Sequence, residues 1–278
     1  MHVDRLLMVQ EDPSVLESLG RLLERKDRRL KEVTNGAEAL NLLRAERFDL
    51  VVAGQGRNGT DAIKLLRRLQ AVRPDTKVIL TGEPNPSRAI GALRARAYGY
   101  VHLPFSGSHL PDMVQQALES ASWREDIRVL SGRPEWIALD VRCRLEAAER
   151  ATHLVRELTS DLDASTCEDI TATFRELLLN GIEHGGRSDP RKRVRVSVLR
   201  AAHAIMVHMR DPGKGFSLEG IAHAAVSNPE DSPTRHVEIR EQLGQRPGGF
   251  GILMASHLVD QLLYNERGNE VFFVKKVP

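Results

Sequence analysis

The stretch Phe174-Arg-Glu-Leu-Leu-Leu-Asn-Gly-Ile-Glu-His-Gly-Gly186 joins a helical apolar pattern to two polar side chains and a pair of glycines. Successive residues of an α-helix are about 100° apart, so Glu176 and Asn180 lie within about 40° of each other, with Thr173 on the same side. The apolar residues fall on the opposite arc, which predicts the packed face of the helix: Ile170, Phe174, Leu177, Leu178 and Gly181. A carboxylate and an amide one turn apart can serve as a general base and a metal ligand, although the same pair also occurs as an exposed polar stripe.

The sequence around this helix predicts further strands and helices between residues 134 and 278. Alternating apolar and polar residues mark half-buried strands, and apolar residues three or four apart mark helices. In chain order, the expected elements are a strand over 136–143, a helix over 145–158, the central helix over 166–184, strands over 194–198 and 204–209, a helix from 252, and a hairpin of 262–264 with 271–274. Gly185 and Gly186 are expected to end the central helix, as glycine commonly does.

Two glycine motifs follow the central helix. The first is Asp211-x-Gly213-x-Gly215, which places a carboxylate at the tip of a strand and lets backbone approach a ligand closely. The second is Gly249-x-Gly251 at the start of a helix, where free N–H groups and the positive end of the helix dipole suit phosphate oxygens. Residues 217–247 between them carry few signals of regular structure, and a connection of this length predicts a lid.

Three motifs in this order resemble the GHKL (Bergerat-fold) ATPases: Glu176-x-x-x-Asn180, Asp211-x-Gly213-x-Gly215 and Gly249-x-Gly251. The closing Gly248-Gly-Phe-Gly-Ile-Leu-Met-Ala-Ser-His-Leu-Val-Asp-Gln-Leu262 looks most like the anti-sigma-factor serine kinases of bacterial partner-switching systems. The resemblance covers about 140 residues. It implies a two-layer α/β sandwich of the histidine-kinase-like ATPase type, with a mixed sheet and helices on one face.

The resemblance also implies a role for each motif residue in binding ATP and Mg²⁺. Glu176 would be the general base that activates water or a serine hydroxyl, Asn180 would hold Mg²⁺, and Asp211 would accept a hydrogen bond from the adenine amino group. The glycines would lie against the nucleotide, Gly213 and Gly215 by close packing and Gly249 and Gly251 as a cradle for the phosphates. The glutamate of this motif also occurs in relatives that only hydrolyse or bind ATP.

The first 122 residues show a different pattern, in which strands and helices alternate. Strands are expected over 5–9, 30–33, 49–53, 77–80 and 100–103, and helices over 13–23, 37–45, 61–71, 88–97 and 110–122. Such alternation predicts a doubly wound parallel sheet of five strands, of flavodoxin-like type, covered on both faces. Asp12 and Pro13 are expected to cap and begin the first helix.

This half resembles the receiver domains of response regulators in the spacing of its strand-end motifs, but it departs from them at the reactive positions. Gly54 stands where the family has its phosphate-accepting aspartate, Gln10 replaces the first of two acidic residues, and Leu103 replaces the lysine. Only Glu11 and Thr81 are kept. Because Gly54 has no side chain to form an acyl phosphate, we expect a pseudo-receiver that serves docking, dimerisation or an unknown signal. Phosphorylation of Asp12 or Asp61 is the alternative.

The domain organisation expected from these patterns is a pseudo-receiver over 1–122, a linker over 123–133 and an ATPase or serine-kinase domain over 134–278. The net charge of +2 gives no reason to propose nucleic acid or a membrane as a partner. No secretory signal or membrane-spanning apolar run is visible, so we expect a soluble, cytoplasmic protein. Cys143 and Cys167 lack the spacing of metal ligands and are expected to pack in the core.

The resemblance implies an ATP-dependent serine/threonine kinase that phosphorylates an anti-sigma-factor antagonist, sequesters a sigma factor and forms a homodimer. Two alternatives remain open. A histidine kinase would need a phosphoacceptor on a separate helical hairpin, and His153, the only candidate, lies on the helix before the central one. A non-catalytic module would use its nucleotide state only to gate partner docking.

Overall fold

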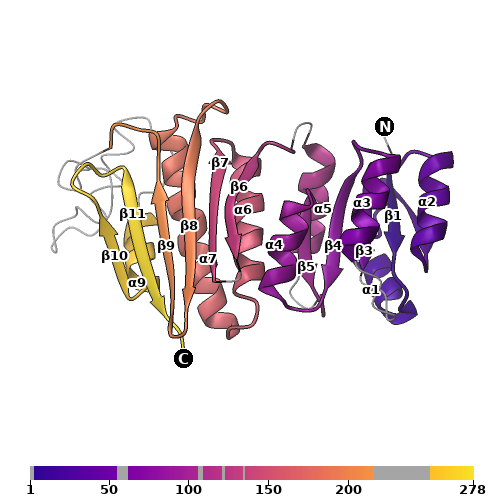
Figure 1. The fold of residues 1–278 in the computed structure, drawn as a ribbon, viewed down its shortest axis with the longest axis horizontal. Helices are drawn as coiled ribbons and strands as arrows, with labels where there is room; N and C mark the ends of the chain where they lie inside the picture. Colours follow the sequence, from indigo (N-terminus) through magenta and orange to yellow (C-terminus); the bar gives the residue numbers. More distant parts are fainter. Residues whose placement is uncertain (1–2, 55–61, 106–108, 121–122, 134, 216–250) are drawn as a thin grey trace. The chain divides into compact units, whose positions relative to one another are not determined.

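The computed structural model describes residues 3–54, 62–105, 109–120, 123–133, 135–215 and 251–278 (Figure 1). The chain divides into two compact units, each with its own sheet. The first comprises residues 1–124 and 157–161, and the second comprises residues 125–156 and 162–278. No helix among the described residues combines the length and the apolarity needed to cross a membrane.

The first unit is a parallel five-stranded sheet of order β2-β1-β3-β4-β5, with helices between successive strands, as the sequence predicts. Its strands are β1 (Asp4–Val9), β2 (Arg28–Val33), β3 (Leu50–Gly54), β4 (Lys77–Gly82) and β5 (Gly99–His102). Its helices are α1 (Pro13–Leu23), α2 (Gly36–Ala45), α3 (Ala62–Val72), α4 (Pro86–Arg94) and α5 (Leu110–Glu119). The doubly wound fold is therefore confirmed.

The central strands of this unit are apolar along their whole length because both faces of the sheet are covered. Leu6, Leu7 and Met8 of β1 are fully buried, although neighbouring residues of a strand point to opposite faces. The predicted start of α1 is also confirmed. The Asp12 carboxylate accepts a hydrogen bond of 2.9 Å from the backbone N–H of Ser14, and Pro13 is the first helical residue.

The second unit is an antiparallel six-stranded sheet of order β10-β11-β9-β8-β7-β6, with helices on one face (Figure 1). The strands are β6 (Ile127–Arg133), β7 (Trp136–Arg142), β8 (Arg193–Ala201), β9 (Ala204–Arg210), β10 (Gln261–Tyr264) and β11 (Glu270–Lys276). The helices are α6 (Leu145–Leu158), α7 (Ala164–Asn180), the π-helical turn η1 (Gly181–Gly185) and α9 (Gly251–Leu258). The expected two-layer α/β architecture is confirmed, but the expected mixed sheet is wrong, because every strand pair of this sheet is antiparallel.

The linker predicted over residues 123–133 is wrong. Trp123 is buried in the core of the first unit, where its ring meets Tyr98 edge-on with centroids 5.6 Å apart. Residues 127–133 form β6, which pairs with β7 along its length and continues the second sheet by one strand. The burial of Trp123 and the pairing of β6 with β7 thus place both parts of the expected linker in folded units.

The central helix ends at the predicted glycines, since η1 ends at Gly185 and Gly186 is its C-cap, but neither glycine is left-handed. Gly186 has φ −80°, an ordinary right-handed value, and the left-handed residues that turn the chain are Arg187 and Ser188, with φ of 56° and 50°. Glycine is needed at 186 for space, because a Cβ there would overlap the Cys143 sulfur. The two glycines at the end of this helix therefore serve close packing rather than a left-handed cap.

Candidate functional site

Helix α7 presents the predicted catalytic pair at one end of the second unit. Asp163 caps the helix by accepting a hydrogen bond of 2.9 Å from the backbone N–H of Thr166, which supplies one of the unpaired donors of the first turn. The predicted apolar arc is buried, while Glu176 and Asn180 are partly exposed. Thr173, which shares their side of the helix, is fully buried, so only the last turn and a half of this side is open.

The carboxylate of Glu176 lies against the start of α9. A Cβ built at Gly251 would overlap Glu176 Oε1, so only glycine at 251 leaves the carboxylate in place. The two helices are also in contact with each other. The fold thus brings the predicted base on one helix next to the predicted phosphate-binding glycine on another. The two residues are 75 positions apart in the sequence.

Asp211 follows the last residue of β9 and is fixed from both sides. Its backbone N–H donates a 3.0 Å hydrogen bond to the carbonyl of Asn269, which belongs to the turn between β10 and β11. Its Oδ1 accepts a 2.7 Å hydrogen bond from the backbone N–H of Gly213. Burial raises the pKa of the Asp211 carboxyl, and the Gly213 N–H opposes that rise in pKa. The site therefore holds a carboxylate whose charge is poorly solvated, which suits a hydrogen-bond acceptor for a ligand N–H.

Close packing around Asp211 depends on two further glycines. A Cβ at Gly185 would overlap the Asp211 carboxylate, and a Cβ at Gly213 would lie 2.8 Å from the Gly185 Cα. Gly181 is less crowded, because its Cβ would lie 3.4 Å from the Asp211 Cβ. The π-helical turn η1, which begins directly after Asn180, brings Gly185 to Asp211 and so joins the first motif to the second. The sequence did not single out Gly185 for this role.

Glycine is also required at position 215, but the reason is a contact within the protein. Its φ is +85°, and a Cβ there would overlap the carbonyl oxygen of Arg267 in the β10–β11 turn. This is a conformation and a contact that only glycine tolerates. The predicted glycine therefore supports the turn that also holds the Asp211 backbone.

Tyr264 belongs to the same site, and sequence reasoning missed it. It ends β10 and pairs with the buried Val271, so it faces the helix layer. Its pKa is raised chiefly by burial and further by the negative charges of Asp211 and Glu176, which places the phenol near both carboxylates. A tyrosine in a closing hairpin reads as an ordinary strand residue, so no signal in the sequence marked it.

The remaining predicted site features are placed only in part. Gly249 and most of the expected lid over 217–247 lie outside the described residues. No group of three or more His, Cys, Asp or Glu side chains within the described ranges is arranged to hold a metal ion. Mg²⁺ bound with ATP needs only one or two protein oxygens besides the phosphates, and Asn180 beside Glu176 fits that requirement.

The reactive positions of the first unit are filled by other groups. A Cβ built at Gly54 would overlap the side-chain amide of Gln10, which occupies the space where a longer side chain would point. Gln10 and Thr81 are both buried. Leu103 directly follows β5. Gly54 therefore lacks both the oxygen and the room for an acyl phosphate. Asp61, the alternative phosphoacceptor, lies outside the described residues, and Asp12 is engaged as the cap of α1.

Comparison with known proteins finds a domain family that matches part of each unit. Residues 6–115 match the response regulator receiver domain, and residues 141–275 match the histidine kinase-like ATPase domain. The chain is 29% identical over 157 residues to the transcriptional regulatory protein GlrR of Escherichia coli (strain K12), covering 54% of this chain and 35% of that protein. It is 30% identical over 129 residues to the regulatory protein AtoC of the same organism, covering 46% and 28%.

The chain spans about a third of the length of the curated relatives GlrR and QseF. Among solved structures, it resembles a BeF3-activated DrrB receiver domain at 25% identity and a TM-score of 0.39, covering 42% of this chain and 99% of that one. It also resembles the signal receiver domain of an HD domain-containing protein from Pseudomonas fluorescens Pf-5, at 26% identity and a TM-score of 0.40, covering 43% and 89%.

Proposed function

Because the chain joins a response regulator receiver domain to a histidine kinase-like ATPase domain, we propose that it is an ATP-dependent serine/threonine protein kinase of a partner-switching system. Its substrate would be an anti-sigma-factor antagonist, and it would also bind a sigma factor. The receiver domain, which cannot be phosphorylated at Gly54, would act as a docking or regulatory module. The two matched families support a signalling protein with an ATP-binding domain.

The observation that carries this proposal is the approach of Glu176 to Gly251 at the start of α9. A helix N-terminus of this kind attracts phosphate, so a base beside it would lie near the γ-phosphate of bound ATP. In the transfer step, the serine oxygen forms a bond to the γ-phosphorus while the bond to the β-γ bridging oxygen breaks. Glu176 takes the serine proton, and ADP leaves. Bound Mg²⁺, held in part by Asn180, would supply positive charge to the phosphates.

Asp211 would orient the nucleotide in this scheme. Its carboxylate is held by Gly213 and by the crowding of Gly185, so an adenine amino group would meet a fixed acceptor. A charged hydrogen bond of this kind contributes about 1.5–3 kcal/mol, which corresponds to about a ten- to hundredfold change in affinity.

The test is calorimetric binding of Mg²⁺-ATP to the wild type, Asp211→Asn and Asn180→Ala, followed by phosphoryl transfer assays with candidate antagonist proteins. We expect both variants to bind more weakly and Glu176→Gln to bind normally without transferring phosphate. If folded wild type does not bind Mg²⁺-ATP, the proposal is wrong. If wild type binds Mg²⁺-ATP but does not differ from Glu176→Gln in phosphoryl transfer or in ATP hydrolysis, the chain is a nucleotide-gated binding module.

The histidine-kinase alternative is less well supported by the fold. His153 lies in the middle of α6, a helix of the second unit with Ala147, Ala151 and Val155 fully buried. A phosphoacceptor there would need to leave a packed helix layer to reach ATP. Acid-stable phosphoprotein in the transfer assay would point to serine or threonine, whereas acid-labile phosphoprotein would point to histidine.

A further inference from the structure

The sheet of the second unit has one face without helices among the described residues (Figure 1). Residues on its other face are buried, as Val194, Val196 and Val198 of β8 show. Their neighbours in the strand point the opposite way, because side chains alternate along a strand. We call the surface formed by these neighbours the open face.

Half of the open face is apolar. The strand registers place four side chains in one row across the sheet: Trp136 of β7, Leu199 of β8, Met206 of β9 and Val274 of β11. Trp136 and Leu199 are 46% and 41% exposed. In the next row Phe272 pairs with Leu263, which is 57% exposed. Contiguous exposed apolar side chains on several strands are typical of a binding surface rather than of scattered surface residues.

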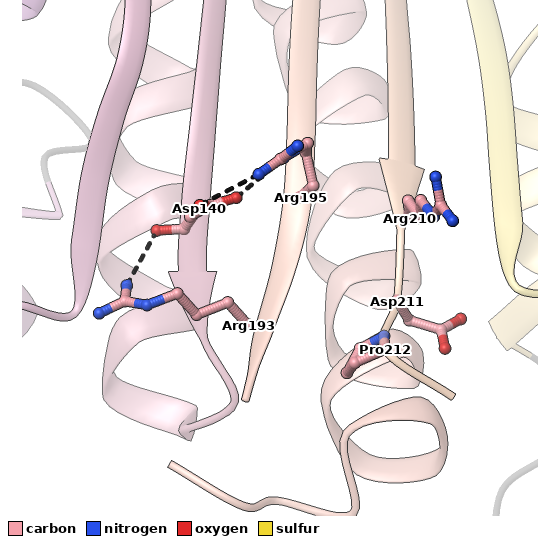
Figure 2. A pocket seen from close by; sticks show the side chains of 6 residues that line it. All are labelled: Asp140, Arg193, Arg195, Arg210, Asp211 and Pro212. Carbon is pink, nitrogen blue, oxygen red and sulfur yellow. Dashed lines mark hydrogen bonds and ion pairs between the residues drawn. The ribbon is translucent and has the colours of Figure 1, made fainter. Parts of the chain in front are cut away.

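The other half of the open face is charged and hollowed. A pocket of about 260 Å³ is lined by Asp140, Arg193, Arg195, Arg210, Asp211 and Pro212 (Figure 2). Register places Asp140, Arg195, Arg210 and Glu270 in one row, two rows from Leu199. We call this the arginine pocket.

The guanidinium groups of the arginine pocket keep donors to spare. Arg195 donates to Asp140 at 3.0 and 3.4 Å, and Arg193 donates to the backbone carbonyls of Asp140 and Glu125 at 3.3 and 2.8 Å. The Arg210 Nε lies 3.5 Å from Glu270 Oε1. Each guanidinium has five N–H donors, so each can still bind a carboxylate.

The edge of the open face adds more positive charge. Arg128 of β6 is in register with Asp140, and Arg133 is in register with Trp136. Both arginines are exposed. With the three arginines of the pocket, they make five positive charges, which outnumber the carboxylates of Asp140, Asp211 and Glu270. The open face is therefore apolar at one end and cationic at the other end and along the β6 edge.

This charge distribution decides between possible occupants. A second copy related by a two-fold axis near the arginine pocket would bring its arginines against those of the first, and like charges at a contact are unfavourable. The receiver unit is a poor fit, because every large apolar side chain found exposed in the described part of the chain belongs to the second unit. A different protein with an apolar surface edged by Asp and Glu fits both halves of the open face.

We propose that the open face is the docking surface for such an acidic partner, whose carboxylates enter the arginine pocket while its apolar side chains cover Trp136 and Leu199. This proposal rests on the proposed function only in requiring a protein partner. Docking on the open face needs no ATP, so a failure of docking and a failure of nucleotide binding are separate results.

The test uses the full chain without nucleotide and two synthetic amphipathic peptides with the same apolar residues, one carrying only Glu and the other only Lys at its charged positions. Fluorescence anisotropy measures binding. We expect the Glu peptide to bind at least about tenfold more tightly than the Lys peptide, since each charge pair at such a contact is commonly worth that factor or more. Arg210→Glu should remove this preference, and Trp136→Ala should weaken the binding of both peptides.

The control is Arg21→Glu, which makes the same charge change on α1 of the receiver unit at a side chain 79% exposed. It should leave both affinities unchanged. Equal binding of the two peptides, no binding, or equal effects of Arg21→Glu and Arg210→Glu would overturn the proposal. Sedimentation of wild type and Leu199→Lys adds a second check. A wild-type dimer that Leu199→Lys dissociates would also overturn it, because the open face would then be a contact between copies.

Discussion

At the scale of single residues, the burial that suits the Asp211 carboxylate to binding a ligand also destabilises the fold at neutral pH. Burial raises the pKa of its carboxyl, so the folded state binds the Asp211 proton more tightly than the unfolded state does. The stability that this group contributes is complete below the unfolded pKa of Asp, and it is lost as pH rises through the higher folded pKa. At neutral pH the ionised carboxylate therefore lowers the free energy of unfolding.

Asp211→Asn should accordingly separate stability from binding. The amide keeps the acceptor for the Gly213 N–H and removes the buried charge, so its urea midpoint at about pH 7 should equal or exceed that of wild type. The difference should shrink when the pH is lowered to the unfolded pKa of Asp, about 3.9. The wild-type carboxyl, whose folded pKa is higher, is then more than half protonated. Affinity for Mg²⁺-ATP should fall about ten- to hundredfold. A variant that is less stable than wild type at both pH values would contradict this account.

Gly185 and Gly181 offer a matched pair for testing the packing around that carboxylate. A Cβ at Gly185 would overlap the Asp211 carboxylate and lie 2.7 Å from the Asp211 Cβ, so rotating the side chain cannot relieve the clash. At Gly181 the nearest atom is the Asp211 Cβ at 3.4 Å. Gly185→Ala should cost about 1–3 kcal/mol of stability and weaken ATP binding, as overpacking does.

Gly181→Ala should leave ATP binding unchanged and raise stability by about 0.4–1 kcal/mol, because Gly181 has helical φ and ψ and alanine lowers the entropy of the unfolded chain. Urea unfolding and calorimetry of the two variants side by side would check this. If the two alanines had equal effects, close packing on Asp211 would not be what requires glycine at 185.

At the scale of helices and strands, pattern predicted most of the fold and failed where local geometry broke the pattern. The helix over 145–158 and the strand beginning at 136 agree with α6 and β7, because their apolar periodicity is regular. Strand β6 was missed, because its register shifts between Val129 and Ser131 and disturbs the alternation. Gly132 and Pro134 then read as a turn signal.

The same reasoning explains which part of the site could be predicted. Glu176, Asn180 and Asp211 could be predicted as site residues because their residue types and spacing carry chemistry, and their roles stay predictions. Tyr264 and Gly185 were not found, because their roles depend on which elements the fold brings together. Such contacts across the fold leave no periodic mark in a single sequence.

Strand β6 leads to a prediction about the boundary of the second unit. A fragment of residues 125–278 should fold, whereas a fragment of residues 134–278 should not. The shorter fragment exposes the edge of β7 and loses Asp126, whose buried carboxylate lies 3.8 Å from the guanidinium of Arg150. Removing one member of a buried charge pair commonly costs about 3–5 kcal/mol. Circular dichroism and thermal melting of the two fragments would test it, and equal melting temperatures would contradict it.

At the scale of the whole molecule, the two units should respond differently to ligand. A ligand that binds only the folded second unit, at a hundred times its Kd, stabilises that unit by about 2.7 kcal/mol and leaves the first unit unchanged. The two tryptophans allow the units to be followed separately. Trp123 is 6% exposed in the first unit, and Trp136 is 46% exposed in the second.

Unfolding detected by the shift of tryptophan emission should therefore follow mainly the first unit, because only Trp123 passes from the core to water. Mg²⁺-ATP should leave that midpoint unchanged and raise a second midpoint detected by circular dichroism. A Trp123→Phe variant should lose most of the emission shift and serves as the control. If ATP moved both midpoints together, the two units would unfold as one, and the separation into independent units would be wrong.

The side chain of Gln10, lying where a substituent on Gly54 would point, has a consequence for timing. The acyl phosphate of an aspartate hydrolyses spontaneously, so an ordinary receiver domain stays phosphorylated for a limited period only. No such decay can occur at Gly54. Any memory that this chain keeps of a past signal must therefore reside at another group. Under the proposed function, that group would be the nucleotide of the second unit or a phosphate placed on another protein. The duration of its response would then be set by ADP release or by a separate phosphatase.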